Sequence, residues 1–360
     1  MKTPEDQIKE LEEEIRKLPY HKGTERHIGV LRARISILKD KQLESQNRKS
    51  GGGGGYAVKK QGDATVVLVG PPSAGKSTLL NALTNAESKV APYSFTTVSV
   101  IPGMMKYKNA YIQILDVPGL IEGAEEGKGR GREVLSVIRN TDLLIIMSDG
   151  ERIEAIPRIQ AALERNGIRV NKRPQRIRIK RHLNGGLTIN TNIRQDLDRD
   201  TIKDIINQMG IKSADVYLEE NITVEGLLDA LSKNRVYIPA LYVVNKADMG
   251  LPKKIPVELE SGFIKMSADK GEGLAAFQES IWKALGLATI YLLKPLQEVN
   301  HDNSMVVKVG MTLKDVMNEI GTEFSEGKTK AKIWGEGAKF AGQEVSLETK
   351  IKENMIVRFI

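Results

Sequence analysis

Residues 66–80 read VVLVGPPSAGKSTLL, and this stretch decides the fold. A short apolar run ends at Gly70, and a helical pattern follows Gly75. The spacing G-x-x-x-x-G-K-[ST] lets backbone N–H groups surround an anion, because glycine permits positive φ and has no side chain to obstruct close approach. Such a loop needs a buried parallel strand before it and a helix after it. Val66 to Val69 and the leucines at 79, 80 and 83 supply these, so the stretch predicts an α/β domain with a phosphate-binding loop.

The residue types in this loop suit a nucleoside triphosphate. Lys76 would reach the β and γ phosphates as a binding and catalytic residue, and Ser77 would supply a hydroxyl ligand for Mg²⁺. A helix beginning near Thr78 would point the positive end of its dipole at the same phosphates. The candidate nucleotide-binding residues of the loop are Gly70, Pro71, Pro72, Ser73, Ala74, Gly75, Lys76, Ser77 and Thr78.

The composition is typical of soluble globular proteins, since 40% of the 360 residues are hydrophobic and 28% are charged. No apolar run approaches the roughly 18 residues that cross a bilayer, and the N-terminus is too charged for a signal peptide, so we expect a cytoplasmic protein without a membrane partner. The absence of cysteine excludes disulfides and thiolate chemistry. A net charge of +8 favours polyanionic partners.

The chain begins with two amphipathic segments within residues 3–47, separated by a break from Pro19 to Gly23. Their apolar spacing predicts a helical hairpin. We consider two roles for it, an arm that packs on the neighbouring domain or a docking element for a partner. Five successive glycines at 51–55 then predict a flexible joint.

Two polar segments follow the phosphate loop in the chain. Residues 91–102 contain Thr96 and Thr97, either of which could complete the Mg²⁺ shell and sense the γ-phosphate, although both could also be ordinary threonines at a strand edge. A hairpin predicted at 104–115 then leads to DVPG, in which Asp116 ends a buried strand beside the phosphate site. Asp116 is a candidate Mg²⁺ ligand, and Gly119 offers a backbone N–H to the γ-phosphate.

The sequence NKAD at 245–248 follows another apolar strand, at 240–244. A carboxylate at Asp248 can accept two hydrogen bonds from the N1–H and 2-amino group of guanine, a pairing that adenine cannot offer. Asn245 and the stem of Lys246 would frame the ring. Ser267 and Ala268 resemble a loop that contacts the base oxygen from the backbone. Together with DVPG, these residues predict guanine binding.

Asp116 and Asn245 lie too far apart for a single strand-helix-strand passage of roughly 50 to 60 residues, so about 75 residues are inserted, and we place them at about 160–235. Within them, residues 165–181 hold eight Lys or Arg and no acid. Arg176, Arg178 and Lys180 alternate with isoleucines and would line one side of a strand. The run is either a solvated face or a contact surface for RNA or the ribosome.

The last 70 or so residues show a different pattern of apolar strands around one helix, which begins near Thr312 with Asp315 in a capping position. This pattern predicts a small ubiquitin-like sheet that packs on a helix. We interpret it as an interaction module.

The segments GPPSAGKST, YSFTT, DVPGLIEGA, NKAD and KIWGEGAKFAGQ together resemble the developmentally regulated GTP-binding protein (DRG) branch of the Obg-related GTPases, in an archaeal-like form. The resemblance covers nearly the whole chain. It implies an α/β P-loop GTPase domain, with a mostly parallel sheet and helices on both faces. It also implies an N-terminal helical hairpin, an inserted α+β domain with a ribosomal-S5-like fold and a C-terminal β-grasp TGS domain. The implied domains are a hairpin at 1–49, a glycine-rich linker at 50–61, the GTPase domain at 62–159 and 236–288, the insert at 160–235 and the TGS domain at 289–360.

The resemblance also assigns roles to single residues. It implies that Lys76 and Ser77 hold phosphate and Mg²⁺, one of Thr96 and Thr97 is the switch I threonine, Asp116 and Gly119 belong to switch II, and Asn245 and Asp248 recognise guanine. Many GTPases place a water-orienting Gln after the switch II glycine, whereas Leu120 stands here and cannot hydrogen-bond. Hydrolysis should therefore be slow and rely on another residue, a monovalent cation or a partner. Whether K⁺ acts stays open, because Ser73 stands where related K⁺-binding GTPases often have Asn.

The implied function is a GTP-binding protein and slow GTPase that hydrolyses GTP to GDP and phosphate. It would act as a switch on ribosomes or RNA in translation, often with a dedicated protein partner. The alternative is an RNA- or ribosome-binding protein in which the guanine nucleotide is mainly structural.

Overall fold

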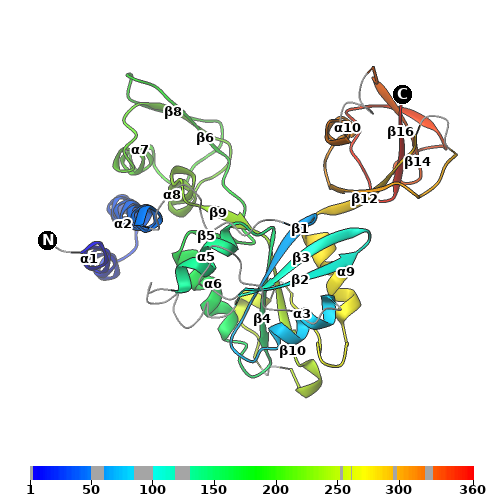
Figure 1. Cartoon of the computed structure of the whole chain (residues 1–360). Coiled ribbons are helices and arrows are strands. Elements are labelled where there is room, and N and C mark those ends of the chain that lie inside the picture. Colours follow the sequence, from blue (N-terminus) through cyan, green and yellow to red (C-terminus); the bar gives the residue numbers. More distant parts are fainter. Residues whose placement is uncertain are drawn as a thin grey trace. The chain divides into compact units, whose positions relative to one another are not determined.

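The phosphate loop directly follows an inner strand of a six-stranded sheet (Figure 1). The computed structural model describes residues 3–49, 61–84, 100–117, 130–251, 254–260, 262–294, 298–320 and 327–360. The strand order is β11-β10-β4-β1-β3-β2, and all neighbouring strands are parallel except the edge pair β2–β3. The strands are β1 (Ala64–Val69), β2 (Ile101–Tyr107), β3 (Ala110–Asp116), β4 (Leu143–Asp149), β10 (Ala240–Asn245) and β11 (Ile264–Lys265).

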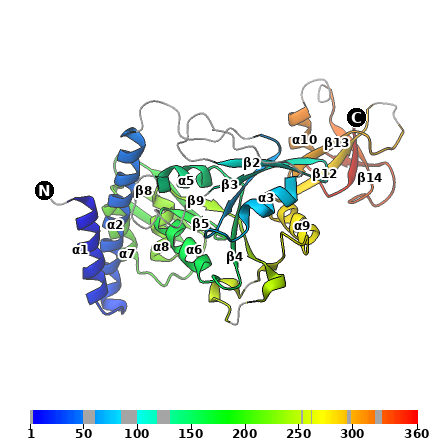
Figure 2. The same ribbon diagram turned by 60° about the horizontal axis from the view of Figure 1, so that its bottom comes forward.

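Helices cover both faces of this sheet. The helices α3 (Lys76–Thr84) and α9 (Leu274–Ala284) pack on one face, where Leu79, Leu80 and Phe277 are fully buried. The helices α5 (Arg130–Arg139) and α6 (Ala155–Arg165) lie on the other face, as both ribbon views show (Figures 1 and 2). The predicted mostly parallel sheet with helices on both faces is confirmed. The helix α3 begins two residues before the expected start near Thr78.

The C-terminal residues form a second, five-stranded sheet in the order β13-β12-β16-β14-β15. It consists of β12 (Leu287–Leu292), β13 (Ser304–Lys308), β14 (Lys330–Trp334), β15 (Gln343–Ser346) and β16 (Met355–Phe359). The helix α10 (Leu313–Ile320) packs on it through Leu313, Val316 and Met317. The expected cap is present, because Thr312 Oγ1 accepts from the Asp315 N–H at 3.2 Å and Asp315 Oδ2 accepts from the Thr312 N–H at 2.8 Å.

The chain divides into two compact units, and the one just described comprises residues 56–163 and 238–360. The other unit, residues 1–55 and 164–237, combines the N-terminal hairpin with the insert. The hairpin consists of α1 (Pro4–Lys17) and α2 (Lys22–Lys49). The insert contains β5 (Ile168–Val170), β6 (Ile177–Arg181), β7 (Leu187–Thr191), α7 (Arg199–Gln208), β8 (Ala214–Leu218), α8 (Val224–Leu231) and β9 (Val236–Ile238).

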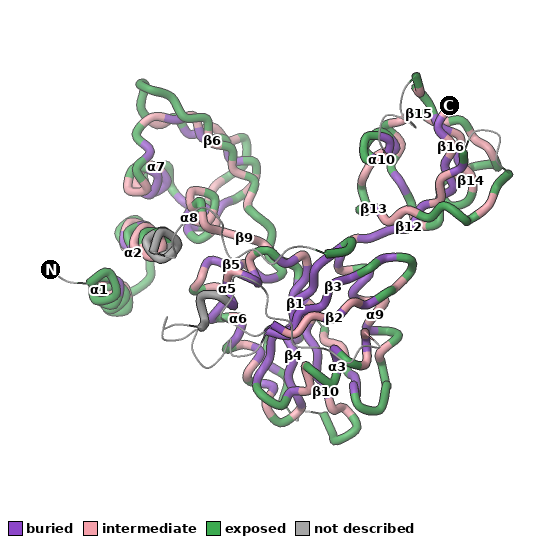
Figure 3. Tube along the Cα trace, viewed as in Figure 1, coloured by how far each residue is buried: buried purple, intermediate pink, exposed green. Residues whose placement is uncertain are grey.

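The hairpin packs against the insert through α2. Ile28 and Leu31 are buried, and Ala33 joins the core formed by α7, α8 and β8. Figure 3 colours these elements by burial. Polar contacts strengthen this packing, since the guanidinium of Arg235 contacts Asp40 at 3.1 Å, Ser36 at 3.0 Å and, through Nε, Asp229 at 2.9 Å. Of the two roles considered for the hairpin, the structure shows the packing arm, and its neighbour is the insert.

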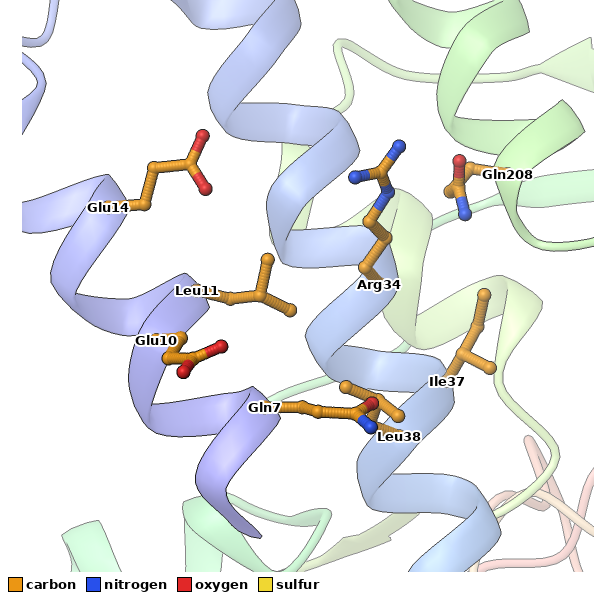
Figure 4. Close-up of a pocket in the computed structure, with 8 residues that line it drawn as sticks. All are labelled: Gln7, Glu10, Leu11, Glu14, Arg34, Ile37, Leu38 and Gln208. Carbon is orange, nitrogen blue, oxygen red and sulfur yellow. The ribbon is translucent and has the colours of Figure 1, made fainter. Parts of the chain in front are cut away.

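A groove of about 440 Å³ runs between α1, α2 and α7 (Figure 4). Leu11, Ile37 and Leu38 provide its apolar lining, with glutamates of α1 on one side and Arg34 on the other. None of the sequence-predicted nucleotide residues lines it.

Among the described residues, no helix is long and apolar enough to span a bilayer.

Candidate nucleotide site

The parallel strands bring the predicted polar residues to one edge of the sheet. Asp116 lies opposite Leu68 in the pairing of β3 with β1, two residues before Gly70. On the other side of β1, β4 ends at Asp149, which lies opposite Asn245 of β10. Because the carboxyl ends of parallel strands meet at the same edge, residues distant in sequence gather beside the phosphate loop.

The phosphate loop has the backbone shape that the glycine spacing predicts. Ser73 has a φ of 58° and Gly75 a φ of 89°, both in the left-handed region. A Cβ at Gly70 would lie 2.3 Å from the carbonyl oxygen of Met147, so only glycine fits between the loop and β4. The Lys76 ammonium donates to the carbonyl oxygens of Gly70 and Pro71, at 3.0 Å each, and therefore lies across the loop.

Ser77 and Asp116, two of the candidate Mg²⁺ ligands, lie next to each other. The Ser77 hydroxyl donates to Asp116 Oδ2 at 2.8 Å. The second carboxylate oxygen, Oδ1, is buried and has no hydrogen-bond partner among the described residues. A buried, unpaired carboxylate oxygen is costly, and a hydrated divalent cation would satisfy it. The donor set of one hydroxyl and one carboxylate suits Mg²⁺, so the residues fit that ion.

Asn245 connects the NKAD segment to the phosphate loop. Its Nδ2 donates to the carbonyl oxygen of Ala74 at 2.9 Å, and its Oδ1 accepts from the Ala268 N–H at 2.9 Å. Asn245 is buried, and a Cβ at Gly75 would lie 2.2 Å from its Nδ2. The sequence predicted that Asn245 frames the base and that Ala268 contacts it. In the structure the Ala268 N–H is already engaged by Asn245, so a contact with the base oxygen would share this donor.

Asp248 lies in the short helix η1 (Ala247–Met249) that follows β10. Hydrogen bonds from Ser267, and then from Lys270, lower the pKa of the Asp248 carboxyl below its ordinary value. A lowered pKa favours the ionised carboxylate, which is the form that can only accept hydrogen bonds. The Lys270 ammonium lies 3.1 Å from Asp248 Oδ2, a contact that sequence reasoning missed because it considered only Ser267 and Ala268 in this loop.

Sequence reasoning also missed Asp149 and Arg152, which follow β4. The Arg152 side chain forms hydrogen bonds to both Asp149 carboxylate oxygens, and its Nη1 donates to the carbonyl oxygen of Pro72 in the phosphate loop. Lys246 Nζ lies 3.6 Å from Asp149 Oδ2. Burial disfavours the Asp149 carboxylate, but the hydrogen bonds and charge of Arg152 outweigh it, so the pKa of Asp149 is lowered.

Part of the predicted site lies outside the described residues. These are Thr96 and Thr97, the two candidate threonines, together with Gly119 and Leu120. The glycine-rich segment that follows Gly119 in the sequence is helical from Arg130 onward, where α5 begins.

The basic run at 165–181 is paired with acidic side chains that lie outside it in the sequence. Arg178 and Lys180 lie on the exposed face of β6, as the alternation predicts, while Arg176 precedes the strand. The run is acid-free in sequence, but its charges are partly neutralised in space. Arg178 Nε lies 2.8 Å from Glu219, and Glu220 pairs with Arg173 at 2.6 Å and with Arg176 at 3.8 Å.

Comparisons with known proteins agree with this geometry. A family model described as a 50S ribosome-binding GTPase matches residues 65–180, and a model of the C-terminal region of the same domain matches residues 184–287. The chain is 42% identical to an uncharacterized GTP-binding protein of Methanocaldococcus jannaschii, covering 99% of this chain and 92% of that one. It is 41% identical to another from Halobacterium salinarum, covering 99% and 98%. Developmentally-regulated G-protein 2 of Arabidopsis thaliana is 35% identical over 99% of this chain and 90% of its own length.

Proposed function

Because the chain belongs to the developmentally regulated branch of the Obg-related GTPases, we propose that it is a slow GTP-driven switch that acts on the ribosome in translation. The family membership confirms the expected GTP-binding P-loop GTPase.

One observation carries the nucleotide assignment. An ionised Asp248 follows the same strand whose last residue, Asn245, is hydrogen-bonded to the phosphate loop. A guanine at Asp248 and phosphates in the loop at 70–77 would thus be held by one connected framework. Lys246, Ser267 and Ala268 complete the base side. Thr78, exposed in the first turn of α3, borders the phosphate side.

Mg²⁺ would be held by Ser77, by Asp116 and by one of Thr96 and Thr97. The bound ion would neutralise charge on the β and γ phosphates. Lys76 adds a second positive charge from within the loop, and Gly119 would donate its N–H to the γ-phosphate. Lys76, Thr96, Thr97 and Gly119 are thus the residues we assign to hydrolysis.

We expect hydrolysis to GDP and phosphate to be slow, because Leu120 cannot orient water. A partner, another side chain or a monovalent cation such as K⁺ must supply what the missing glutamine provides elsewhere. The γ-phosphate would order the segments around Thr96–Thr97 and 119–126, and its release would free them.

The hairpin formed by β2 and β3 offers a path from these segments to the C-terminal module. In sequence it runs from the segment with Thr96 and Thr97 to Asp116. At its turn, the Lys108 carbonyl accepts a hydrogen bond from Thr289 Oγ1 of β12 at 3.1 Å. A shift of this hairpin with nucleotide state would therefore alter this contact at β12, the first strand of the C-terminal module. This supports a role for the C-terminal module in responding to the bound nucleotide.

The ribosome as partner is supported by the printed description of the matching family and by the basic face of β6. We propose that the insert, with its S5-like fold, and the C-terminal TGS domain contact RNA or ribosomal protein, and that the protein acts in the cytoplasm, often together with a dedicated protein partner. Phosphate contacts are the expected mode, because residues 165–181 contain no aromatic side chain for base stacking.

Co-sedimentation with ribosomes tests this proposal. The full chain is mixed with ribosomes under GTP, GDP or no nucleotide, and the pelleted fraction is measured. We expect the largest fraction with GTP. Equal pelleting in all three conditions would contradict the switch, and no pelleting at all would contradict the ribosome as partner.

Leu120 also favours a second function, in which the nucleotide is structural and the chain acts as an RNA- or ribosome-binding protein. Single-turnover hydrolysis with and without ribosomes and K⁺ separates the two. Conversion of bound GTP to GDP under any of these conditions supports the switch, whereas GTP that stays intact in all of them supports the structural role.

A further inference from the structure

The carbonyl oxygen of Pro72 is held from outside the phosphate loop by Arg152. The Nη1 of Arg152 donates to it, while Nε and Nη2 of the same guanidinium bind Asp149. Asp149 is buried at the end of β4, and its Oδ1 also accepts the Arg152 N–H at 3.0 Å. One carboxylate therefore fixes the backbone N–H of Arg152 and two nitrogens of its guanidinium group. The third nitrogen, Nη1, binds the loop.

The hydrogen bond from Arg152 acts on the peptide group between Pro72 and Ser73. Pro71 and Pro72 have no N–H, so the first N–H after Gly70 that the loop can offer to a phosphate belongs to Ser73. That N–H shares a peptide plane with the Pro72 carbonyl. In a trans peptide the C=O and N–H point in opposite directions, and all described peptide bonds are trans. Fixing the Pro72 oxygen against Arg152 therefore turns the Ser73 N–H to the opposite side of the loop.

The neighbouring carbonyl groups have a different partner. Lys76 donates to the oxygens of Gly70 and Pro71, and the Pro71 oxygen also accepts from the Ala74 N–H at 3.3 Å. The Pro72 oxygen, which is the next along the loop, is bound by Arg152 instead. The turn hydrogen bond from Ala74 to Pro71 holds the ends of this segment, whereas Arg152 binds the carbonyl of the Pro72–Ser73 peptide itself. Without Arg152 this peptide would lose the hydrogen bond to its own oxygen, and Ser73 already has a left-handed φ that costs free energy for a residue with a side chain.

We infer that Arg152 is a positioning residue of the nucleotide site, which aims the Ser73 N–H at the phosphates by holding the Pro72 carbonyl, and that Asp149 fixes Arg152 for this task. The ligand is the diphosphate portion of a nucleotide. Asp149 also faces Lys246, so the same carboxylate borders both the phosphate and the base side of the site. The inference rests on the proposed binding of phosphates in the loop at 70–77.

The test uses the full chain labelled with ¹⁵N-serine, because two serines report on the two ends of the loop. On addition of GDP and Mg²⁺, we expect the amide protons of both Ser73 and Ser77 to shift downfield in the wild type, as a hydrogen bond to phosphate forms. In Arg152→Ala the Ser77 amide should still shift, while the Ser73 shift should be lost or strongly reduced. GDP affinity measured by calorimetry should fall roughly tenfold or more, because the loop loses the hydrogen bond from the charged Arg152 to the Pro72 carbonyl.

Two further variants serve as controls. Arg158→Ala removes an exposed arginine of α6 and should leave both amide shifts and the GDP affinity unchanged. Arg152→Lys keeps the charge beside Asp149 but not the fork, and should restore part of the Ser73 shift. A Ser73 shift that is the same in Arg152→Ala as in the wild type overturns the inference. Absence of a Ser77 shift in the wild type would instead overturn the proposed phosphate site itself.

Discussion

Asn245 donates a hydrogen bond from Nδ2 to the carbonyl oxygen of Ala74 at 2.9 Å, which joins the end of β10 to the phosphate loop. The same side chain accepts from the Ala268 N–H, so three segments far apart in sequence meet at one buried amide. The first residue of the NKAD motif is thus part of the framework of the site. It need not contact the base to matter for nucleotide affinity.

Replacing this amide should weaken binding of the whole nucleotide. In Asn245→Ala the Ala74 carbonyl and the Ala268 N–H lose their partner, which costs about 1–3 kcal/mol in a buried setting. We expect GDP affinity, measured by calorimetry, to fall by about 10- to 100-fold and the thermal midpoint to drop. Asn140→Ala removes an exposed asparagine of the same unit and is the matched control. Equal GDP affinities in the two variants would contradict the framework role.

The base assignment depends on the carboxylate of Asp248. Asp248→Asn replaces an acceptor with an amide that can donate, so the variant should prefer xanthosine triphosphate, which presents an oxygen where guanine has its 2-amino group. Competition binding of the two triphosphates gives the preference directly. A variant that still prefers GTP would show that another residue reads the base.

The parts of this site that the sequence predicted are those fixed by short-range pattern. The strand and helix around the phosphate loop, and Asp116 and Asn245 at strand ends, follow from the apolar runs that precede them, because parallel strands end at a common edge. Arg152 was missed because its partner is the carbonyl of Pro72, eighty residues earlier in the chain. No local spacing marks a side chain that acts on a distant peptide group.

The same reasoning explains the basic run. Counting charges along 165–181 shows no acid, but Glu219 and Glu220, which directly follow β8, come close to these cations because β8 pairs antiparallel with β6. The packing of α2 on the insert was likewise open from sequence. An amphipathic stripe shows that a helix is covered on one side, and only the fold shows that α7 and α8 cover it.

Removal of Mg²⁺ should reveal the role of Asp116. Its Oδ1 is buried without a partner among the described residues, so the carboxylate is costly in the absence of the ion. In Asp116→Asn we expect the gain in GTP affinity on adding Mg²⁺ to fall by at least about tenfold, because a neutral amide is a poor ligand. The stability measured in EDTA should be unchanged or higher, since a buried charge is removed. A large loss of stability in EDTA would instead indicate that Asp116 is a structural residue.

The ion pair of Asp149 should make stability depend on pH in a defined direction. Its pKa is lower in the folded protein than the value of about 3.9 in an unfolded chain, so its contribution is full above that value and is lost as the pH falls through the folded pKa. Asp149→Asn should therefore cost about 1–2 kcal/mol at pH 7 in urea unfolding, and the difference from wild type should shrink in the acid range. The exposed Asp302→Asn serves as control. A difference that grows on acidification would contradict the assignment.

Salt dependence can decide what the basic face of β6 does. Changing Arg178 and Lys180 of this face, together with Arg176 just before the strand, to Gln removes three cations. Binding to ribosomal RNA should therefore weaken, and the slope of log affinity against log salt should flatten by about 2. The triple change of Lys9, Arg16 and Lys17 on α1 removes the same net charge from exposed positions of the same unit and should leave the slope unaltered. Glu219→Gln frees Arg178 from its counter-charge and should strengthen binding. A variant that loses phosphate contacts releases fewer counterions on binding, so its slope of log affinity against log salt must be shallower. If the β6 variant keeps the wild-type slope, the run is a solvated face.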